Sequence, residues 1–224
     1  MGLLDDPRID HDYLEAHGFD RSRFEAEAEA VAAGRLKAED AIIRGTIEPD
    51  PEVATVRADD TEARDLGRRA LERGEVAVVV LNGGMATRFG GVVKGVVEVA
   101  AGKSFIALKI EDVLRAGKRF GSAVPFVAMN SFATAEATLH HVRDHSGFGA
   151  RPDDLLSFEQ TIAVRLTERG ELFVQDDGSA SYYAPGHGDF FPCIRHSGVL
   201  KTLRARGVRH VLFSNVDNLG AVLD

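Results

Sequence analysis

The chain has 224 residues, of which 44% are hydrophobic and 28% are charged, and its formal net charge is −8. This composition is typical of a folded globular protein, and the acidic balance argues against nucleic acid as a partner, because nucleic-acid-binding surfaces are basic. The length allows one large domain or one and a half smaller ones. The single cysteine, Cys193, excludes an intramolecular disulfide and fits a reducing compartment.

The two ends of the chain carry different signals. The start, MGLLDDPRID, is acidic and lacks the basic-then-apolar pattern of a signal peptide, and no apolar run approaches the roughly 18 residues that a membrane span needs. We therefore expect a cytoplasmic protein without a membrane partner. The sequence stops at NVDNLGAVLD, directly after an apolar run and a polar cluster typical of a site. We expect further sequence beyond Asp224, and weak or no activity from this chain alone.

Residues 1–74 are predicted to form a helical N-terminal segment. Two stretches, RSRFEAEAEAVAAGRL and DDTEARDLGRRALERGE, are rich in good helix formers. Asp60 or Thr61 is expected to cap the second helix, and Gly74 to end it. Between them, GTIEPDPEVATV carries two prolines and is typical of a linker. Nothing in this segment indicates chemistry.

A different pattern begins at Glu75. Short apolar runs, as expected of strands buried on both faces, occur at residues 76–81, 124–130 and 210–218. Helical stretches alternate with them, and in the one after Ser104 we expect a single apolar stripe made of Ile106, Ile110, Val113 and Leu114. Strands that alternate with helices predict an α/β fold with a mostly parallel sheet, here in a domain that spans residues 75–224.

Polar residues follow all three predicted strands. They are Asn82-Gly83-Gly84, Met129-Asn130-Ser131 and the run from Ser214 to Asn218. Because ligands of open α/β sheets bind beyond the carboxyl ends of the strands, these three segments are predicted to form one pocket.

The glycine-rich stretch VVVLNGGMATRFGG, residues 78–91, indicates an anion-binding turn. Its glycine spacing does not match the G-x-G-x-x-G pattern of dinucleotide sites. A P-loop is also disfavoured, because the first glycine that Gly102-Lys103-Ser104 would require falls on Val97. Small residues let backbone N–H groups approach an anion, and Arg88 and Lys94 supply positive charge.

The strand, the glycine loop and the lysine resemble the signature of sugar-nucleotide pyrophosphorylases. Four further blocks follow in order: MNSFATAEAT, FEQ, YYAPGHGDFFPCIRHSGVL and VLFSNVDNLGAVLD. Together they resemble the N-terminal and central part of the eukaryotic-type UTP–glucose-1-phosphate uridylyltransferases, over roughly residues 75–224. The resemblance implies a Rossmann-like, GT-A-like nucleotidyltransferase sheet. It also implies a reaction in which the sugar phosphate attacks the α-phosphorus of UTP and pyrophosphate leaves.

The resemblance implies a role for each of several residues. Lys94 and Arg88 would lie at the phosphates as catalytic residues, His187 and Asn215 at the sugar, and Asp217 would hold Mg²⁺. Gln160 would pair with uracil, because an amide presents both a donor and an acceptor. The nucleotide-binding set would be Leu81, Asn82, Gly83, Gly84, Met129, Gln160 and Gly188. Asp189 would orient the loop Gly186-His187-Gly188, which is similar to that of the glucose enzymes.

Two departures from the family pattern keep alternatives open. Ala86 stands where the signature has a glycine, and would be strained if the backbone there needs a positive φ. Lys94 arrives one residue early and without the usual preceding proline. The alternatives are a uridylyltransferase for another sugar 1-phosphate, or a UDP-sugar-binding protein that has lost turnover. The sequence does not indicate the oligomeric state.

A group of histidines, His140, His141 and His145, invites a zinc interpretation. Zinc would need further ligands, and no cysteine or acidic residue is suitably placed. We therefore expect these histidines to lie on a solvated helix face.

Overall fold

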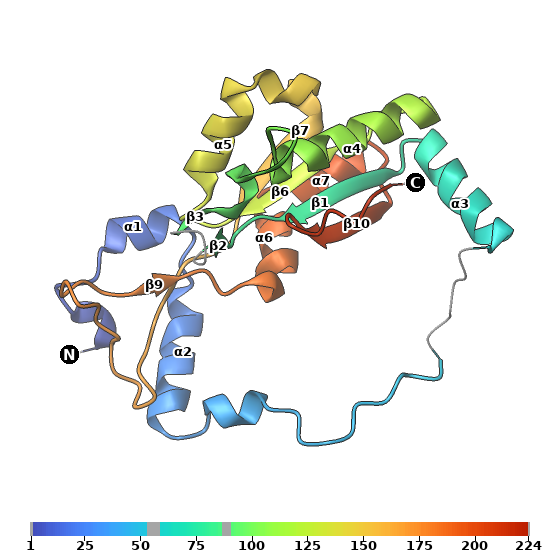
Figure 1. Cartoon of the computed structure of the whole chain (residues 1–224). Helices are drawn as coiled ribbons and strands as arrows, with labels where there is room; N and C mark the ends of the chain where they lie inside the picture. The colour runs from blue at the N-terminus through green and yellow to red at the C-terminus, as the bar shows by residue number, and fades with distance from the viewer. Residues whose placement is uncertain (1, 53–58, 87–90, 224) are drawn as a thin grey trace. The chain divides into compact units, whose positions relative to one another are not determined.

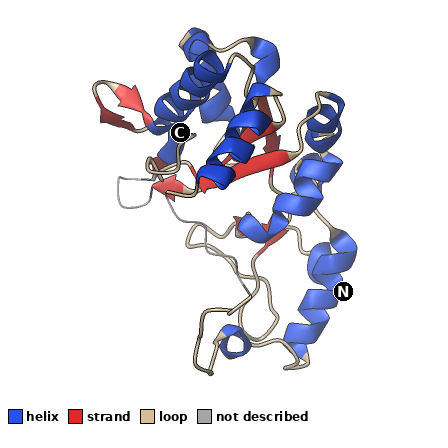
Figure 2. Ribbon diagram, turned by 90° about the vertical axis from the view of Figure 1, so that its right-hand side faces the viewer, coloured by secondary structure: helices blue, strands red, loops and turns tan. Residues whose placement is uncertain are grey.

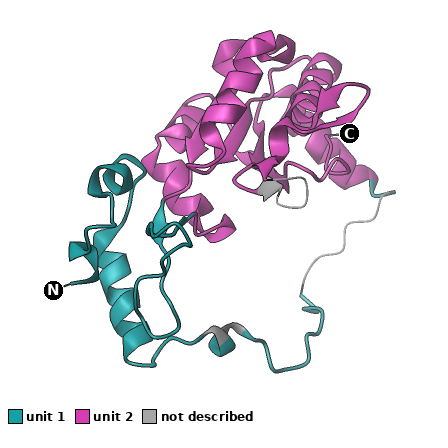
Figure 3. Ribbon diagram, turned by 60° about the vertical axis from the view of Figure 1, so that its left-hand side comes forward, with its two compact units in different colours: residues 1–60, 162–183 teal, residues 61–161, 184–224 magenta. Residues whose placement is uncertain are grey.

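The computed structural model describes residues 2–52, 59–86 and 91–223. The chain divides into two compact units, one formed by residues 1–60 with 162–183 and the other by residues 61–161 with 184–224 (Figure 3). The sequence-based division between residues 74 and 75 stays a prediction.

The smaller unit combines short helices with a two-stranded antiparallel hairpin. Two of its helices, at residues 11–16 and 21–32, begin at aspartate N-caps: Asp10 accepts the backbone N–H of Tyr13, and Asp20 accepts that of Arg23. Such caps satisfy N–H groups that a helix leaves unpaired. The elements are η1 (Leu3–Asp5), α1 (His11–Ala16), α2 (Arg21–Ala32), η2 (Ala38–Ala41), β8 (Ala163–Val164) and β9 (Tyr182–Tyr183).

A four-stranded parallel sheet forms the centre of the larger unit (Figure 1). Its strand order is β10-β1-β6-β7, so that β1 lies inside the sheet. All six residues of β1 are buried, as expected for a parallel strand covered on both faces. The strands are β1 (Val76–Leu81), β6 (Phe126–Asn130), β7 (Leu155–Glu159) and β10 (His210–Asn215). The predicted parallel α/β fold is confirmed.

Helices cover both faces of this sheet (Figure 2). Alternate side chains of β1 point to opposite faces: Val78 and Val80 pack in one core cluster, Val79 and Leu81 in the other. The first cluster includes residues of α3 (Thr61–Glu72) and α4 (Phe105–Phe120), with α5 (Ala135–Asp144) at its margin. The second includes residues of α6 (Phe190–His196) and α7 (Val199–Ala205).

Helix α4 corrects one detail of the expected apolar stripe. It begins at Ser104, whose Oγ accepts the N–H of Ala107, and ends at Gly121 with a left-handed φ of 71°. Ile106, Ile110 and Val113 are buried as expected, but Leu114 is 36% exposed. The buried face of the helix continues instead through Ala116 and includes Lys109, which is 3% exposed.

Short elements connect the main ones. They are β2 (Met85–Ala86), β3 (Val92–Val93), η4 (Lys94–Val96), β4 (Glu98–Ala100), β5 (Lys103–Ser104), η5 (Ser146–Gly149), η6 (Pro152–Asp154) and η7 (His187–Asp189). Ala86 pairs with Val92 in an antiparallel bridge, and alanine adopts this extended backbone without strain. None of the helices within the described residues has the length and apolar character needed to cross a bilayer.

Candidate functional site

The carboxyl ends of β1, β6 and β10 lie at one edge of the sheet, because the three strands are parallel and in register. Leu81 is opposite Asn215 on one side and opposite Met129 on the other. The chain therefore leaves the sheet at three neighbouring points, which brings together the segments after Leu81, Met129 and Ser214. The predicted juxtaposition of the polar strand ends is confirmed.

Lys94 and Asp217 form an ion pair beside this edge. The Lys94 Nζ donates to Asp217 Oδ2 at 2.9 Å, and the two side chains are 36% and 37% exposed. The hydrogen bond from Lys94 holds the pKa of the Asp217 carboxyl below its ordinary value of 3.8, against a smaller effect of burial that raises it. A lysine and a carboxylate that face solvent at a sheet edge can bind phosphate and a cation, respectively.

Asn82 is the centre of a buried polar cluster just below the edge. It is fully buried, and its Nδ2 donates to Asn130 Oδ1 and to Thr138 Oγ1, each at 2.8 Å. Asn82 Oδ1 and Asn130 Nδ2 have no hydrogen-bond partner among the described residues. A Cβ at Gly95 would lie 2.2 Å from Asn82 Oδ1, so Gly95 is required for η4, which begins at Lys94, to approach the cluster.

Gln160 connects two glycine loops. It is 3% exposed, and its Oε1 accepts the backbone N–H of Gly186 at 3.1 Å. A Cβ at Gly83 would lie 2.1 Å from Gln160 Nε2, and the Gly83 carbonyl accepts the Ser131 hydroxyl at 3.0 Å. The Gln160 amide therefore lies directly against the loop that follows β1.

The loop around residue 187 is held by a buried aspartate. Asp189 is 4% exposed and accepts hydrogen bonds from the Thr161 hydroxyl and from Cys193 Sγ. Burial is the main cause that raises the pKa of the Cys193 thiol. His187 and Gly188, at the start of the same short helix η7, are exposed. Asp189 thus fixes the loop while His187 and Gly188 stay accessible to a ligand.

The remaining predicted site residues differ in their exposure to solvent. Leu81 and Met129 are 6% and 0% exposed and pack in the core, and the Met129 carbonyl accepts the N–H of Asn82 at 2.8 Å. Gly84 and Asn215 are exposed. Arg88 lies outside the described residues. Sequence reasoning assigned no role to Gly95 or Thr138, because their contacts with Asn82 depend on the tertiary fold. It placed Ser131 among the polar strand ends, but its contact with the Gly83 carbonyl, 48 positions away, leaves no local pattern.

The described residues contain no group of three or more His, Cys, Asp or Glu side chains placed to bind a metal ion. Of the three histidines, His140 and His145 are exposed, as expected, and His141 is half-buried. His141 Nε2 lies 2.8 Å from Ser104 Oγ, and burial lowers the pKa of His141. The rings of His145 and Phe148 stack at 5.1 Å. These contacts pair His141 with Ser104 and His145 with Phe148, while His145 stays exposed.

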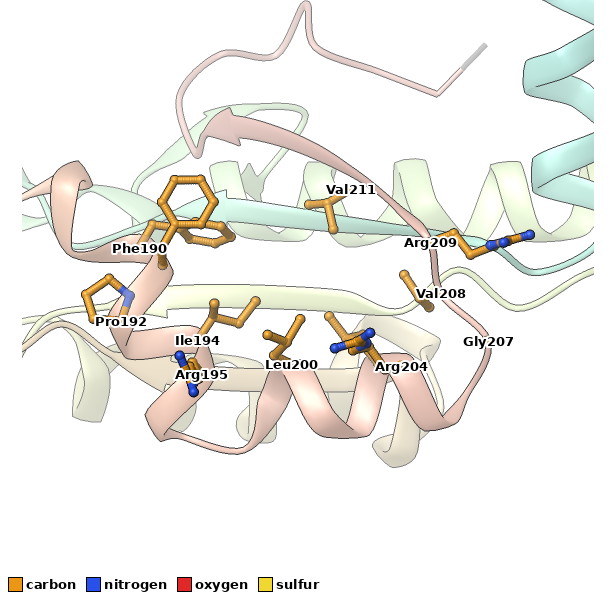
Figure 4. Close-up of a pocket in the computed structure, with 12 residues that line it drawn as sticks. Phe190, Pro192, Ile194, Arg195, Leu200, Arg204, Gly207, Val208, Arg209 and Val211 are labelled. Atoms are coloured by element: carbon orange, nitrogen blue, oxygen red, sulfur yellow. The ribbon is translucent and has the colours of Figure 1, made fainter.

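A separate hollow of about 990 Å³ lies between α6, α7 and β10. Figure 4 shows apolar side chains such as Phe190, Leu200 and Val211 around it, together with Arg195 and Arg204. Its lining includes none of the residues predicted to bind nucleotide, sugar or metal. The strand-end edge, rather than this hollow, therefore combines the polar groups expected of a ligand site.

Comparison with known proteins places these features in a family. A family model described as UTP–glucose-1-phosphate uridylyltransferase matches residues 22–224. UTP–glucose-1-phosphate uridylyltransferase 2 of Dictyostelium discoideum is 35% identical over 182 residues, which are 80% of this chain and 36% of that protein. The UTP–glucose-1-phosphate uridylyltransferase of Solanum tuberosum is 33% identical over 180 residues, 79% of this chain and 36% of the relative.

Solved structures show the same fold. A UDP-glucose phosphorylase from Trypanosoma brucei matches with a TM-score of 0.70 at 24% identity, over 95% of this chain and 45% of that one. A uridine diphosphate N-acetylglucosamine pyrophosphorylase from the same organism matches with a TM-score of 0.62 at 20% identity, over 98% and 52%. The chain spans about a third of the length of the curated relatives it matches. Since the family model covers most of its residues, this chain belongs to the UTP–glucose-1-phosphate uridylyltransferase family.

Proposed function

We propose that this chain carries the nucleotide-binding part of an enzyme that forms UDP-glucose and pyrophosphate from UTP and glucose 1-phosphate. The observation that carries the proposal is the Lys94–Asp217 pair at the carboxyl edge of the sheet, beside the loop Asn82-Gly83-Gly84, in a chain of this family. Cytoplasmic location belongs to the same proposal.

The chemistry requires two polyanions to be positioned and their charge neutralised. An oxygen of the sugar phosphate attacks the α-phosphorus of UTP, the bond to the β-phosphate oxygen breaks, and pyrophosphate leaves. In phosphoryl-group chemistry of this kind the protein contributes chiefly position and electrostatic stabilisation. Lys94 supplies a cation that reaches solvent at the sheet edge, and Arg88 is proposed as the second.

The nucleotide base is proposed to bind at Gln160. The Gln160 amide lies against Gly83 and is held by the Gly186 N–H, so that it is oriented before a ligand arrives. Its donor and acceptor match the edge of uracil. Gly83 and Gly84 let the ligand approach the backbone. Leu81 and Met129 are proposed to support this loop from the core cluster in which they pack, and Asn82 through its hydrogen bonds to Asn130 and Thr138.

The sugar phosphate is proposed to bind between two exposed polar groups, His187 with Gly188 on η7 and Asn215 at the end of β10. Asp189, the next residue on η7, positions His187 and Gly188 through its hydrogen bonds from Thr161 and Cys193. Hydroxyl-rich ligands need such donors and acceptors in fixed places.

The metal is proposed to be Mg²⁺, held by Asp217. A part-exposed carboxylate next to a phosphate site fits this ion, which usually takes one or two carboxylates together with substrate phosphates and water. When bound, magnesium neutralises charge on the triphosphate. Lys94 and Asp217 pair with each other in this structure, so each would exchange that partner for a ligand.

A test of the activity would follow pyrophosphate release with UTP, Mg²⁺ and a panel of sugar 1-phosphates, in the longest polypeptide that contains this sequence. We expect release with glucose 1-phosphate and its loss in Lys94→Ala, while Lys118→Ala, an exposed lysine on α4, keeps it. Release with a different sugar only would reassign the substrate. Binding of UDP-glucose without release in the whole panel would identify a binding protein instead.

A further inference from the structure

Helix α4 carries a lysine on its buried face. Lys109 is 3% exposed and lies between Ile106 and Ile110 in the core-facing stripe, both of which are fully buried. Burying an ammonium group is costly unless each N–H is hydrogen-bonded. The position of Lys109 in the fold therefore depends on the acceptors around it.

The Lys109 ammonium has three acceptors, all in or after β10. Its Nζ donates to the carbonyl of Asn218 at 2.6 Å, to the carbonyl of Ala221 at 2.7 Å and to Ser214 Oγ at 3.3 Å. The three N–H bonds of the ammonium group are thus accounted for. Two of the acceptors are backbone carbonyls, so the contact holds the path of the chain and not a side chain alone.

Asp112, one turn further along α4, holds the same segment at a later point. It is 6% exposed, and its Oδ2 accepts the backbone N–H of Leu223 at 3.1 Å, while Oδ1 accepts Arg115 at 2.9 Å. We name residues 216–223 the post-β10 segment. Lys109 and Asp112 fix this segment at Asn218, Ala221 and Leu223.

Asp217 belongs to the post-β10 segment and lies between two of the groups that Lys109 holds. Ser214 precedes it and Asn218 follows it, and Val216 is 2% exposed in the core. The Asp217 side chain, in contrast, is 37% exposed and faces Lys94. The exposed Asp217 carboxylate is therefore attached to a backbone segment that Lys109 and Asp112 hold by hydrogen bonds.

We propose that Lys109 is a positioning residue that fixes Asp217 at the sheet edge by hydrogen-bonding the backbone of the post-β10 segment. The inference rests on the proposed function in so far as Asp217 serves a metal–nucleotide complex. An apolar side chain of similar size would fill the same space but would leave the carbonyl groups of Asn218 and Ala221 without their donor, which costs stability. The ammonium group of Lys109 holds the backbone of the post-β10 segment in one conformation, through the carbonyl groups of Asn218 and Ala221. Burial lowers the pKa of Lys109, while the charges of Asp112 and Asp217 act in the opposite direction.

The test compares Lys109→Met with Lys118→Met, a lysine-to-methionine change at an exposed position of the same helix, in the longest polypeptide that contains this sequence. The first readout is backbone hydrogen exchange over residues 216–223, with β1 and β6 as internal references. The second is the affinity for UTP measured with Mg²⁺ and again with a chelator. The thermal midpoint of each variant is recorded beside them.

We expect Lys109→Met to speed exchange in the post-β10 segment about tenfold or more and to leave β1 and β6 unchanged. We also expect it to weaken UTP binding about tenfold with Mg²⁺, and to leave binding without the metal unchanged. If Lys109 only supported the fold, its replacement would weaken UTP binding equally with and without Mg²⁺. Lys118→Met should match the parent chain in every readout.

Unchanged exchange in the post-β10 segment of Lys109→Met would overturn the proposal, as would equal losses of affinity with and without metal. If Lys109→Met does not fold, Lys109→Gln decides, because it keeps a polar side chain but has no ammonium group: faster exchange in the post-β10 segment supports the proposal, and no change overturns it. A parent chain that does not bind UTP would contradict the proposed function, and the exchange result would still decide the role of Lys109.

Discussion

Lys94 Nζ donates to Asp217 Oδ2 at 2.9 Å, although 123 positions separate the two residues in the chain. The contact exists because β1 and β10 are adjacent parallel strands in register, with Leu81 opposite Asn215. Each residue follows one of these strands, so the end of the sheet brings a cation and a carboxylate together. This pair is the geometric basis for placing phosphate and metal at the edge.

Removing Lys94 should change the titration of Asp217. The hydrogen bond from Lys94 is the main cause that holds the pKa of Asp217 below 3.8, so the pKa should rise towards its ordinary value in Lys94→Ala. The stabilisation from this pair is present above that ordinary value and is lost as the pH falls through the folded-state pKa. A carboxyl-detected NMR titration measures the shift. Lys118→Ala should leave the pKa of Asp217 as it is, and an unshifted value in Lys94→Ala would contradict the pairing.

Gly83→Ala should disturb the proposed base-binding residue. The new Cβ would lie 2.1 Å from Gln160 Nε2 and 3.1 Å from its Cδ, and Gln160 is enclosed. We expect overpacking to cost about 1–3 kcal/mol of unfolding free energy and UTP binding to weaken about tenfold. Calorimetric titration and thermal unfolding measure the two effects. Gly84→Ala is the matched control for unfolding, because nothing lies within 4 Å of its Cβ position. Equal unfolding free energies of the two variants would contradict the packing of Gly83 against Gln160.

Gly95→Ala should destabilise the buried amide cluster. Its Cβ would lie 2.2 Å from Asn82 Oδ1 and 3.0 Å from Asn82 Cγ, and Asn82 is tied to Asn130 and Thr138. We expect a loss of about 1–3 kcal/mol, read as a lower thermal midpoint by about 2–4 °C for each kcal/mol in a chain of this size.

The comparison for Gly95 is Gly67→Ala, in the exposed middle of α3 with open space around its Cβ position. This change should raise stability by about 0.5–1 kcal/mol, because glycine is a poor residue for a helix interior. A destabilised Gly67→Ala together with an unaffected Gly95→Ala would contradict the packing described for both sites.

Asp154→Asn should reduce the acid sensitivity of the larger unit. Burial raises the pKa of Asp154, but the hydrogen bonds from Arg151 and Arg206 outweigh it and leave the pKa below 3.8. The ion pairs therefore stabilise the fold above that ordinary value, and the effect fades as the pH falls. We expect the thermal midpoints of the parent and Asp154→Asn to differ more at about pH 7 than at about pH 3. Asp153→Asn, at the exposed neighbouring position, is the control; a difference that grows on acidification would disprove this account.

Local patterns in the sequence determined the fold class. The runs at β1, β6 and β10 are short and apolar, and helices stand between them, so a parallel α/β sheet follows from periodicity and from the need to cover both faces. The glycine loop and the polar strand ends were visible for the same reason, because each is a local sequence feature. Leu114 was predicted to be buried because it lies four residues after Ile110. The buried face of the helix instead runs through Val113 and Ala116 and includes Lys109, and Leu114 is exposed.

Only the tertiary structure determined which residues of the site contact each other. Asn82 with Thr138, Gln160 with Gly186, Lys94 with Asp217 and Lys109 with the post-β10 segment are contacts between segments distant in sequence. No local spacing encodes them, because they depend on which strands are neighbours and in which register. Lys109 shows the limit most clearly. Helical spacing puts it on the apolar face, three residues after Ile106 and four before Val113, and only the chain folded over it supplies the carbonyl groups that make its burial possible.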